Sequence, residues 1–271
     1  MKYKKYHLKR IFKEIKNIYK DSDSSSAEYD YLNIVQEAID NESSFDTFRS
    51  DKRYQDILEH INEDLAKNYY FKLREELSHK EILNLCNSIQ LIGSPLLIKF
   101  RDDLLNPTSL RYINVALDLK NKFSGNNFEN FIELGAGFGG QALILNQFYK
   151  IKSYTFVDLP QVNELIKKFL NLHNPNFDFN FATIDTYERC DKYDLFLSNY
   201  AYSELPKRLQ INVASKIIKD TKYGYMIVNN YNSYSIRYLS RRGYEKYLNN
   251  LCVFNEIPES YIFNKILTFK N

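Results

Sequence analysis

A glycine-rich string at residues 132–140 narrows the choice of folds more than any other part of the sequence. It reads Ile-Glu-Leu-Gly-Ala-Gly-Phe-Gly-Gly. An apolar run typical of a strand precedes it at 131–134, and a run with helical periodicity follows at 141–149. Glycines between a strand and a helix let the backbone turn tightly and let a ligand come close to it. The string therefore predicts a ligand-binding turn at the carboxyl end of a strand.

Apolar runs alternate with stretches of helical periodicity from about residue 126 onwards. We expect strands over 131–134, 153–157, 177–182, 193–198 and 225–229. We expect helices over 141–149, 161–172 and 207–219. This alternation predicts an α/β fold whose sheet is mostly parallel, with helices on both faces. The last two apolar runs, 251–254 and 261–269, are joined by a connection too short for a crossover helix, so they predict a hairpin and an antiparallel last strand.

The first part of the chain has a different pattern. Helical periodicity extends from about 29 to 121, with interruptions at 93–95 and 106–108. The final helix of this run, 109–121, is expected to be capped by Thr108 or Asn106. We therefore divide the chain at residue 105. We expect residues 1–105 to form a helical region that acts as a lid, selects the substrate or mediates homodimer formation. We expect residues 106–271 to form the ligand-binding domain.

Charge and cysteine content exclude several classes of protein. The net charge is +3 over 271 residues, too small to favour a nucleic-acid partner. Three separated cysteines indicate neither a zinc site nor a disulfide framework, and we expect no metal. No apolar run is long enough for a signal peptide or a membrane span, so we expect a cytoplasmic protein. Residues 1–20 form a basic amphipathic pattern, which suits either a solvated helix or weak peripheral contact with an anionic membrane.

The glycine string fits two ligand-binding patterns. Gly135, Gly137 and Gly140 match G-x-G-x-x-G, typical of dinucleotide sites, and residues 133–139 match E-x-G-x-G-x-G, typical of S-adenosylmethionine sites. Asp158, which ends the second strand, suits the ribose of either ligand. Glu133, the single nucleotide-binding half and the antiparallel ending favour S-adenosylmethionine. A nucleotide-dependent oxidoreductase and a non-catalytic relative remain as alternatives.

Three strings resemble those of bacterial sugar O-methyltransferases. They are Pro-Thr-Ser-Leu-Arg-Tyr-Ile at 107–113, the glycine string with Gln141, and Ser-Asn-Tyr-Ala-Tyr-Ser-Glu-Leu at 198–205. The resemblance covers about residues 93–271. It implies a Rossmann-like methyltransferase that modifies a sugar hydroxyl of a surface glycan or of its nucleotide-linked precursor. The alternatives are methylation of a non-sugar small molecule or a protein, and a non-catalytic cofactor-binding subunit of a glycan-assembly system.

Ligands of an open α/β sheet bind outside the carboxyl ends of the parallel strands, and this rule selects the candidate cofactor residues. The loop after the third strand, with Asp185, is expected near the adenine. The resemblance implies that Arg111 folds across the cofactor and that Gln141 bonds to it. The predicted cofactor residues are Glu133, Gly135, Gly137, Gly139, Gln141, Asp158, Asp185, Asn199 and Arg111.

The same rule selects candidates for catalysis and for the acceptor. A sugar hydroxyl is a weak acid, so a proton acceptor is expected, and Glu204 after the fourth strand is the first choice, with Tyr202 beside it. A helix-capping role for Glu204 and core packing for Tyr202 are the competing interpretations. His173 follows a helix and is expected at the opposite edge of the sheet. The predicted substrate-binding residues are Tyr200, Asn229, Asn230, Tyr231 and Arg237.

Overall fold

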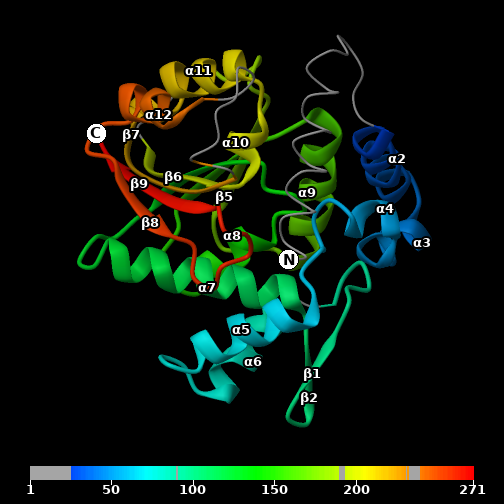
Figure 1. Cartoon of the computed structure of the whole chain (residues 1–271). Helices are drawn as coiled ribbons and strands as arrows, with labels where there is room; N and C mark the ends of the chain where they lie inside the picture. The colour runs from blue at the N-terminus through cyan, green and yellow to red at the C-terminus, as the bar shows by residue number, and fades with distance from the viewer. Residues whose placement is uncertain (1–25, 90, 189–192, 230, 232–238) are drawn as a thin grey trace, which may run out of the picture.

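The computed structural model describes residues 26–89, 91–188, 193–229, 231 and 239–271. Its centre is a seven-stranded sheet in the order β5-β4-β3-β6-β7-β9-β8 (Figure 1). The strands are β3 (Asn130–Leu134), β4 (Ser153–Val157), β5 (Asp178–Ala182), β6 (Tyr193–Asn199), β7 (Thr221–Val228), β8 (Cys252–Asn255) and β9 (Lys265–Lys270). Strands β3 to β7 are mutually parallel, and β9 is antiparallel to both β7 and β8. The predicted parallel sheet and antiparallel last strand are confirmed.

Helices cover both faces of this sheet, as predicted (Figure 1). One face carries α7 (Pro107–Lys122), α8 (Gly140–Leu145) and α9 (Pro160–His173). The other carries α10 (Ala201–Glu204), α11 (Lys207–Lys216), the 3₁₀ helix η2 (Ile218–Asp220) and α12 (Arg241–Tyr247). Neighbouring strand residues alternate between the two cores: Phe131 packs with the α7 face and Ile132 with the α11 face. Both faces of the sheet are therefore buried, which suits its nearly continuous apolar strands.

The helix α7 begins where its sequence predicts. The side chain of Asn106 accepts a hydrogen bond from the backbone N–H of Ser109 at 2.9 Å, and Pro107 occupies the first turn, where no intrahelical N–H partner is needed. Of the two predicted caps, Asn106 is therefore the residue that caps the helix. The helix brings Tyr112 against the glycine loop, with 6.0 Å between the ring centroids of Tyr112 and Phe138.

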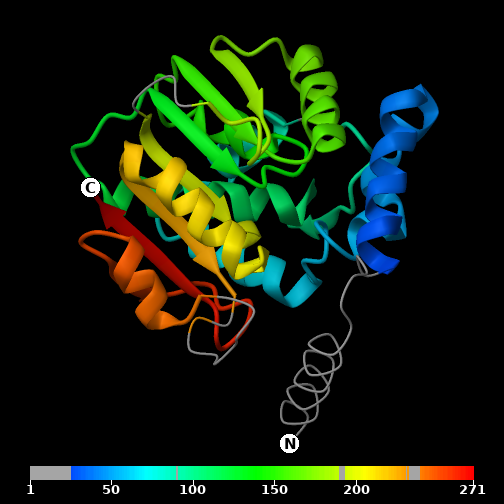
Figure 2. The ribbon, with the colours of Figure 1, turned by 90° about the horizontal axis from the view of Figure 1, so that it is seen from above.

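Helices dominate the described residues before α7. They are α2 (Ser26–Asp40), α3 (Glu42–Phe45), the 3₁₀ helix η1 (Phe48–Ser50), α4 (Lys52–Gln55), α5 (Glu63–Leu73) and α6 (His79–Asn87). Helix α2 lies along α9, and α5 and α6 lie against α7 (Figure 2). Within the described residues, no helix is long and apolar enough to cross a membrane. The predicted helix at 1–20 lies outside the described residues.

The helical prediction is wrong for the segment just before α7. Residues 98–105 form the antiparallel hairpin β1 (Ile98–Phe100) and β2 (Asp103–Leu105). The chain reverses at Arg101, whose φ of 57° lies in the left-handed region that favours tight hairpin turns. A segment this short has too few residues for periodicity to separate a strand pair from a helical turn.

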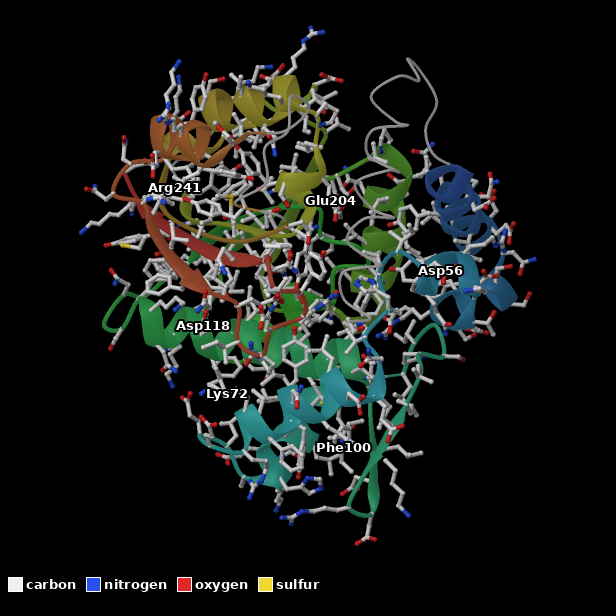
Figure 3. The ribbon with its side chains drawn as sticks, in the orientation of Figure 1. Asp56, Lys72, Phe100, Asp118, Glu204 and Arg241 are labelled. Carbon is white, nitrogen blue, oxygen red and sulfur yellow. The ribbon has the colours of Figure 1, made fainter. Side chains whose placement is uncertain are left out.

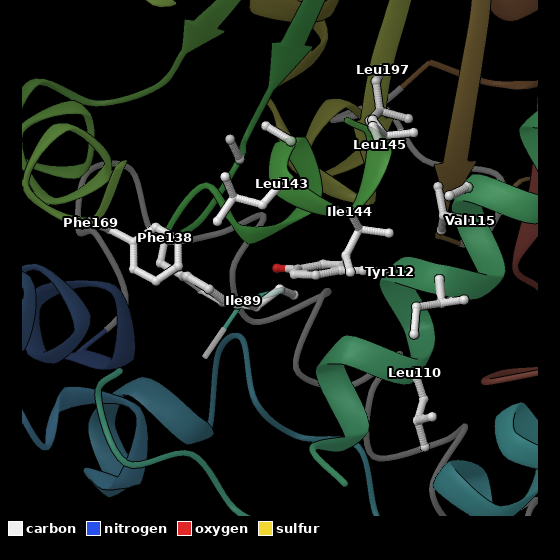
Figure 4. Packing of buried hydrophobic residues seen from close by; sticks show 14 of the residues in the cluster. Ile89, Leu110, Tyr112, Val115, Phe138, Leu143, Ile144, Leu145, Phe169 and Leu197 are labelled. Atoms are coloured by element: carbon white, nitrogen blue, oxygen red, sulfur yellow. The ribbon is translucent and has the colours of Figure 1, made fainter. Parts of the chain in front are cut away.

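A single buried cluster joins the helices before α7 to the sheet (Figure 4). Phe138 of the glycine loop packs edge-on against Phe169 of α9, with 5.0 Å between ring centroids. Phe48 of η1 approaches the same Phe138 ring, with 6.4 Å between centroids. The glycine loop is therefore held from below by α9 and from the side by the N-terminal helices.

Candidate active site

The glycine loop adopts the conformation that its sequence predicts. Gly135, Gly137 and Gly139 have φ of 76°, 62° and 87°, all in the region that residues with a side chain rarely adopt. A methyl group in place of the Gly135 hydrogen would lie 2.1 Å from Cβ of Ala201. A methyl group at Gly137 would lie 3.2 Å from Cδ1 of Leu58. The loop is thus bounded by the start of α10 on one side and by an N-terminal segment on the other.

Asp158 lies beside this loop at the end of β4. Its carboxylate accepts a hydrogen bond from the N–H of Leu159 at 2.8 Å. Burial raises the pKa of Asp158 to about 6, and the N–H groups of Leu159, Ala136 and Gly137 oppose this rise. Tyr31 of α2 is close enough for the Asp158 charge to add to burial in raising the pKa of its hydroxyl. Asp158, the residue predicted to bind the ribose, therefore lies between the glycine loop and α2.

Glu133 is farther from solvent than the sequence indicates. Its side chain is 1% exposed, and the hydroxyl of Tyr154 donates to its Oε2 at 2.7 Å. Burial raises the pKa of Glu133 to about 8, the Tyr154 hydrogen bond opposes this rise, and the negative charge of Asp158 adds to it. The carboxyl group of Glu133 is therefore held by Tyr154 within the sheet, directly before the glycine loop, and its predicted role toward the cofactor stays a prediction.

Two polar atoms beneath the loop have no partner among the described residues. Arg111 is 7% exposed, and its Nη2 makes a long hydrogen bond of 3.5 Å to the carbonyl of Leu58. Its Nε has no acceptor. Asn199 donates to Oε1 of Gln141 at 3.3 Å, while its own Oδ1 has no donor. Since buried polar atoms are normally paired, these two atoms indicate a place for a polar ligand.

Gln141 positions Asn199. Its Nε2 donates to the carbonyl of Tyr112 at 3.1 Å, and its Oε1 receives the Asn199 amide. Gln141 is 1% exposed. Both the nitrogen and the oxygen of the Gln141 amide are therefore hydrogen-bonded within the protein. Gln141 thereby orients Asn199, which we predict to contact the cofactor.

A second polar cluster lies at the end of β6. Tyr200 has a φ of 70°, unusual for an aromatic residue and typical of strained functional positions. Its hydroxyl donates to the carboxylate of Glu256, which is 3% exposed and also accepts from the backbone N–H and hydroxyl of Ser260. The guanidinium of Arg111 lies 5.9 Å from the centre of the Tyr200 ring. Tyr69 of α5 also reaches the Tyr200 hydroxyl.

Sequence reasoning missed two residues of this site. Glu256 is one acid in a connection between two strands, and no spacing links it to Tyr200. His60 belongs to the N-terminal segment that carries Leu58. His60 is exposed as a residue, but partial withdrawal of its ring from water lowers its pKa, and the positive charge of nearby Arg111 lowers it further. Neither residue carries a local signal, because both reach the site through tertiary folding.

Glu204 and Asn229 come together as the topology requires. Asn229 at the end of β7 donates from Nδ2 to Oε1 of Glu204 at 2.7 Å. Glu204 ends α10 and is exposed (Figure 3). Asp185 is also exposed, in the turn after β5. Asn230 and Arg237 lie outside the described residues.

Tyr202 follows the competing interpretation, core packing, and Tyr231 lies deeper than a substrate-binding role predicts. Tyr202 is fully buried and its hydroxyl donates to the carbonyl of Gln210 at 3.0 Å. Tyr231 is 4% exposed and packs on Tyr244, with 5.6 Å between ring centroids. Both rings are enclosed in the core on the α11 face, so they contribute packing and offer no open face to an acceptor. His173 lies at the end of α9, where its ring contacts the carbonyl oxygens of Phe169 and Ile89.

No protein-family model and no curated protein matches this chain. Among solved structures, the N-terminal domain of EvdMO1, crystallised in the presence of SAH and D-fucose, has a TM-score of 0.48 and 14% identity, over 72% of this chain and 97% of that one. A Thermoplasma acidophilum protein, 1320, has 0.46 and 17%, over 70% and 97%. An S-adenosylmethionine-dependent methyltransferase from Clostridium acetobutylicum has 0.45 and 12%, over 59% and 89%. Likeness at this level carries no conclusion about activity. The strand order of the chain itself establishes a Rossmann-like α/β fold with the antiparallel ending seen in methyltransferases.

Proposed function

We propose that this protein is an S-adenosylmethionine-dependent O-methyltransferase that acts on a sugar hydroxyl of a surface glycan or of its nucleotide-linked precursor. The observation that carries the cofactor assignment is the pair of unpaired buried atoms, Arg111 Nε and Asn199 Oδ1. Arg111 reaches Leu58, which adjoins Gly137, and Asn199 bonds to Gln141 just after the glycine loop. One is a cationic donor and the other is a neutral acceptor. They complement the carboxylate and the ammonium group of a methionyl moiety, respectively.

The remaining groups at this edge fit the rest of the cofactor. Asp158 is a carboxylate at the end of the strand next to the glycine loop, suited to two ribose hydroxyls. Asp185 and the turn after β5 are assigned to the adenine. When bound, S-adenosylmethionine supplies an electrophilic methyl group. The protein residues hold it, exclude water and place the acceptor hydroxyl in line.

Tyr200 and Glu256 are assigned to the acceptor. The ring of the strained Tyr200 lies 5.9 Å from the guanidinium of Arg111, which we assign to the methionyl carboxylate. Its hydroxyl is fixed by Glu256 and can accept a hydrogen bond from a sugar. We also assign Asn229 to the sugar, because its hydrogen bond to Glu204 holds it at the same edge of the sheet.

The proton of the acceptor hydroxyl needs an acceptor on the protein. Glu204 is the proton acceptor predicted from the sequence, and its contact with Asn229 keeps it at the edge where β6 and β7 end. His60 is a second candidate, because its lowered pKa leaves it neutral at pH 7 and it lies near Arg111. The two candidates come from different parts of the chain and can be separated by mutation.

The cofactor assignment can be tested by calorimetric titration with S-adenosylmethionine, its demethylated product and NADH. We expect the first two to bind and NADH not to bind. Arg111→Gln should weaken S-adenosylmethionine by about tenfold or more, because a hydrogen bond to a charged group contributes about 1.5–3 kcal/mol. Asp158→Asn should also weaken it. Arg101→Gln and Asp56→Asn, at exposed positions, should not. Equal losses in these controls, or preference for NADH, would contradict the assignment.

The reaction can be tested by transfer of labelled methyl groups to nucleotide sugars and glycans. If Glu204 accepts the proton, Glu204→Gln should lower kcat by about 100-fold or more while leaving cofactor affinity unchanged. If His60 does so, His60→Asn should abolish the rise in kcat with pH, whose midpoint should lie below 6.5. Tight cofactor binding with no transfer to any sugar would favour the non-catalytic alternative, and transfer to a protein or a non-sugar metabolite would replace the sugar assignment.

A further inference from the structure

A cavity of about 320 Å³ lies between α5, α7 and the β8–β9 hairpin, outside the site described above. We call it the α7 groove. Its lining includes Lys72 and Glu76 of the α5 side, Asn114, Asp118 and Asn121 of α7, and Phe254 of β8. Figure 3 shows Asp118 and Lys72 on the facing helices α7 and α5.

The groove begins where the proposed acceptor site ends. Arg111, Asn114 and Asp118 are spaced three and four residues apart, so they follow one another along the same face of α7. The amide of Asn114 donates to the carbonyl of Ile257 at 3.1 Å, and Ile257 is the neighbour of Glu256. At 1.5 Å per residue, Arg111 and Asp118 are about 10 Å apart along the helix axis. A ligand that spans both positions is longer than a monosaccharide.

The side chains of the groove suit a neutral, hydroxylated ligand. Among the described residues, the side-chain carbonyl oxygens of Asn114 and Asn121 accept no hydrogen bond, while their amide groups are held by Ile257 and Glu76. Carbonyl oxygens held in this way are acceptors for hydroxyl groups. Phe254 is 40% exposed at the edge of the sheet and offers an apolar surface.

The charges of the groove balance. Lys72 and Lys122 line it together with Glu76 and Asp118, and Lys122 lies 3.4 Å from Asp118. The ammonium group of Lys122 is also 3.7 Å from the centre of the Phe254 ring. A diphosphate or a nucleic acid would need a surplus of positive charge here. The groove therefore fits uncharged sugar units better than a nucleotide.

We propose that the α7 groove binds the second and following sugar units of an oligosaccharide acceptor whose methylated hydroxyl lies at Tyr200. The groove offers these units side-chain amides, balanced charges and one aromatic ring. The inference rests on the proposed function. It narrows that function to a glycan chain as the acceptor, in preference to a nucleotide sugar.

Binding without turnover tests this proposal. The probes are maltotetraose, cellotetraose, mannotetraose and chitotetraose, with the corresponding monosaccharides, titrated by saturation-transfer NMR. We expect at least one tetraose to bind more tightly than its monosaccharide. Phe254→Ala should weaken that tetraose by about fivefold or more, because the ring supplies apolar contact area. The matched control is Val253→Ala, since Val253 is 42% exposed on the same strand and its side chain points to the opposite face.

The outcomes separate this proposal from the proposed function. No tetraose binding, equal weakening by both variants, or equal weakening of the monosaccharide would overturn the groove assignment. Calorimetric titration with S-adenosylmethionine is the independent measurement. Normal cofactor binding with no tetraose binding means that the groove assignment alone is wrong. Tetraose binding lost in Phe254→Ala, in a protein that binds no S-adenosylmethionine, means that the groove binds glycans and the methyltransferase assignment is wrong.

Discussion

The backbone of Tyr200 and the glycine loop meet at one point. Gly135 must lack a side chain, because any Cβ there would overlap Ala201, the residue after Tyr200. Tyr200 in turn adopts a positive φ that places its ring beside Arg111. The strain at Tyr200 and the requirement for glycine at 135 are therefore two aspects of the same close approach between the ends of β3 and β6.

Replacement of Gly135 tests this close approach. Gly135→Ala introduces both an unfavourable φ and an overlap with Ala201, whereas Gly125→Ala introduces only the φ, since nothing lies within 4 Å of its added methyl group. We expect Gly125→Ala to lower the free energy of unfolding by about 1–2 kcal/mol and Gly135→Ala to lower it by about 1–3 kcal/mol more. Urea denaturation measures both. Equal effects would show that the overlap is relieved without cost.

Glu133 predicts a specific pH dependence of stability. Its folded-state pKa of about 8 lies above the ordinary 4.5, so the folded protein binds more protons than the unfolded chain between these values. The free energy of unfolding should therefore fall as pH rises, by up to about 1.4 kcal/mol per pH unit. Asp158, raised to about 6, contributes in the same direction at lower pH. Urea denaturation between pH 6.5 and 8 isolates Glu133, and Glu133→Gln should flatten the slope. A slope unchanged in this variant would refute the assignment.

At the scale of elements, a buried network attaches the N-terminal helices to α7. Arg49 of η1 donates from Nε to Oε1 of Glu59 at 2.6 Å and from Nη2 to Oδ1 of Asn106, the cap of α7, at 3.0 Å. Thr108 donates to Oε2 of Glu59 at 3.1 Å. The guanidinium also lies 4.2 Å from the centre of the Phe138 ring in the glycine loop. The start of α7, which carries the string at 107–113, is thus held in place by residues far away in sequence.

Removal of Arg49 tests this attachment. Arg49 is fully buried, and Arg49→Ala leaves the Glu59 carboxylate buried without its cation, so we expect a loss of about 3–5 kcal/mol in unfolding free energy. Arg53 is the control, because its side chain is 34% exposed in its pairs with Glu37 and Asp51. Arg53→Ala should cost about 1 kcal/mol or less. Similar losses in the two variants, measured by urea denaturation, would argue against a special role for the network.

At the scale of the molecule, the N-terminal helices share their core with the sheet. The cluster on the α7 face includes Val35 of α2 and Leu165 of α9, both fully buried. A lid that packed on the surface would keep a core of its own. The division at residue 105 remains a prediction about function, since the packing runs across it.

Shared packing predicts one cooperative thermal transition for the described parts on both sides of residue 105. Differential scanning calorimetry should give a single peak. Leu165→Ala, in the sheet domain, should lower the free energy of unfolding by about 2–5 kcal/mol, and Val35→Ala, in α2, should shift the same peak. Leu172→Ala is the control, because Leu172 is 61% exposed. Two peaks, with each core variant shifting a different one, would mean that the N-terminal helices unfold as a separate unit.

Local sequence was sufficient to predict the sheet, the glycine loop and the position of Asp158, because strand and helix periodicities and the demand for glycine at positive φ act over a few neighbouring residues. It also predicted that Glu204 and Asn229 would lie at one edge. It did not predict Glu256, His60, the Arg49 network or the enclosure of Tyr202 and Tyr231. Only the tertiary structure decided these, because burial and pairing depend on which distant segments pack together. The α7 groove was likewise decided by the tertiary structure, since it exists only where α5, α7 and the last hairpin meet.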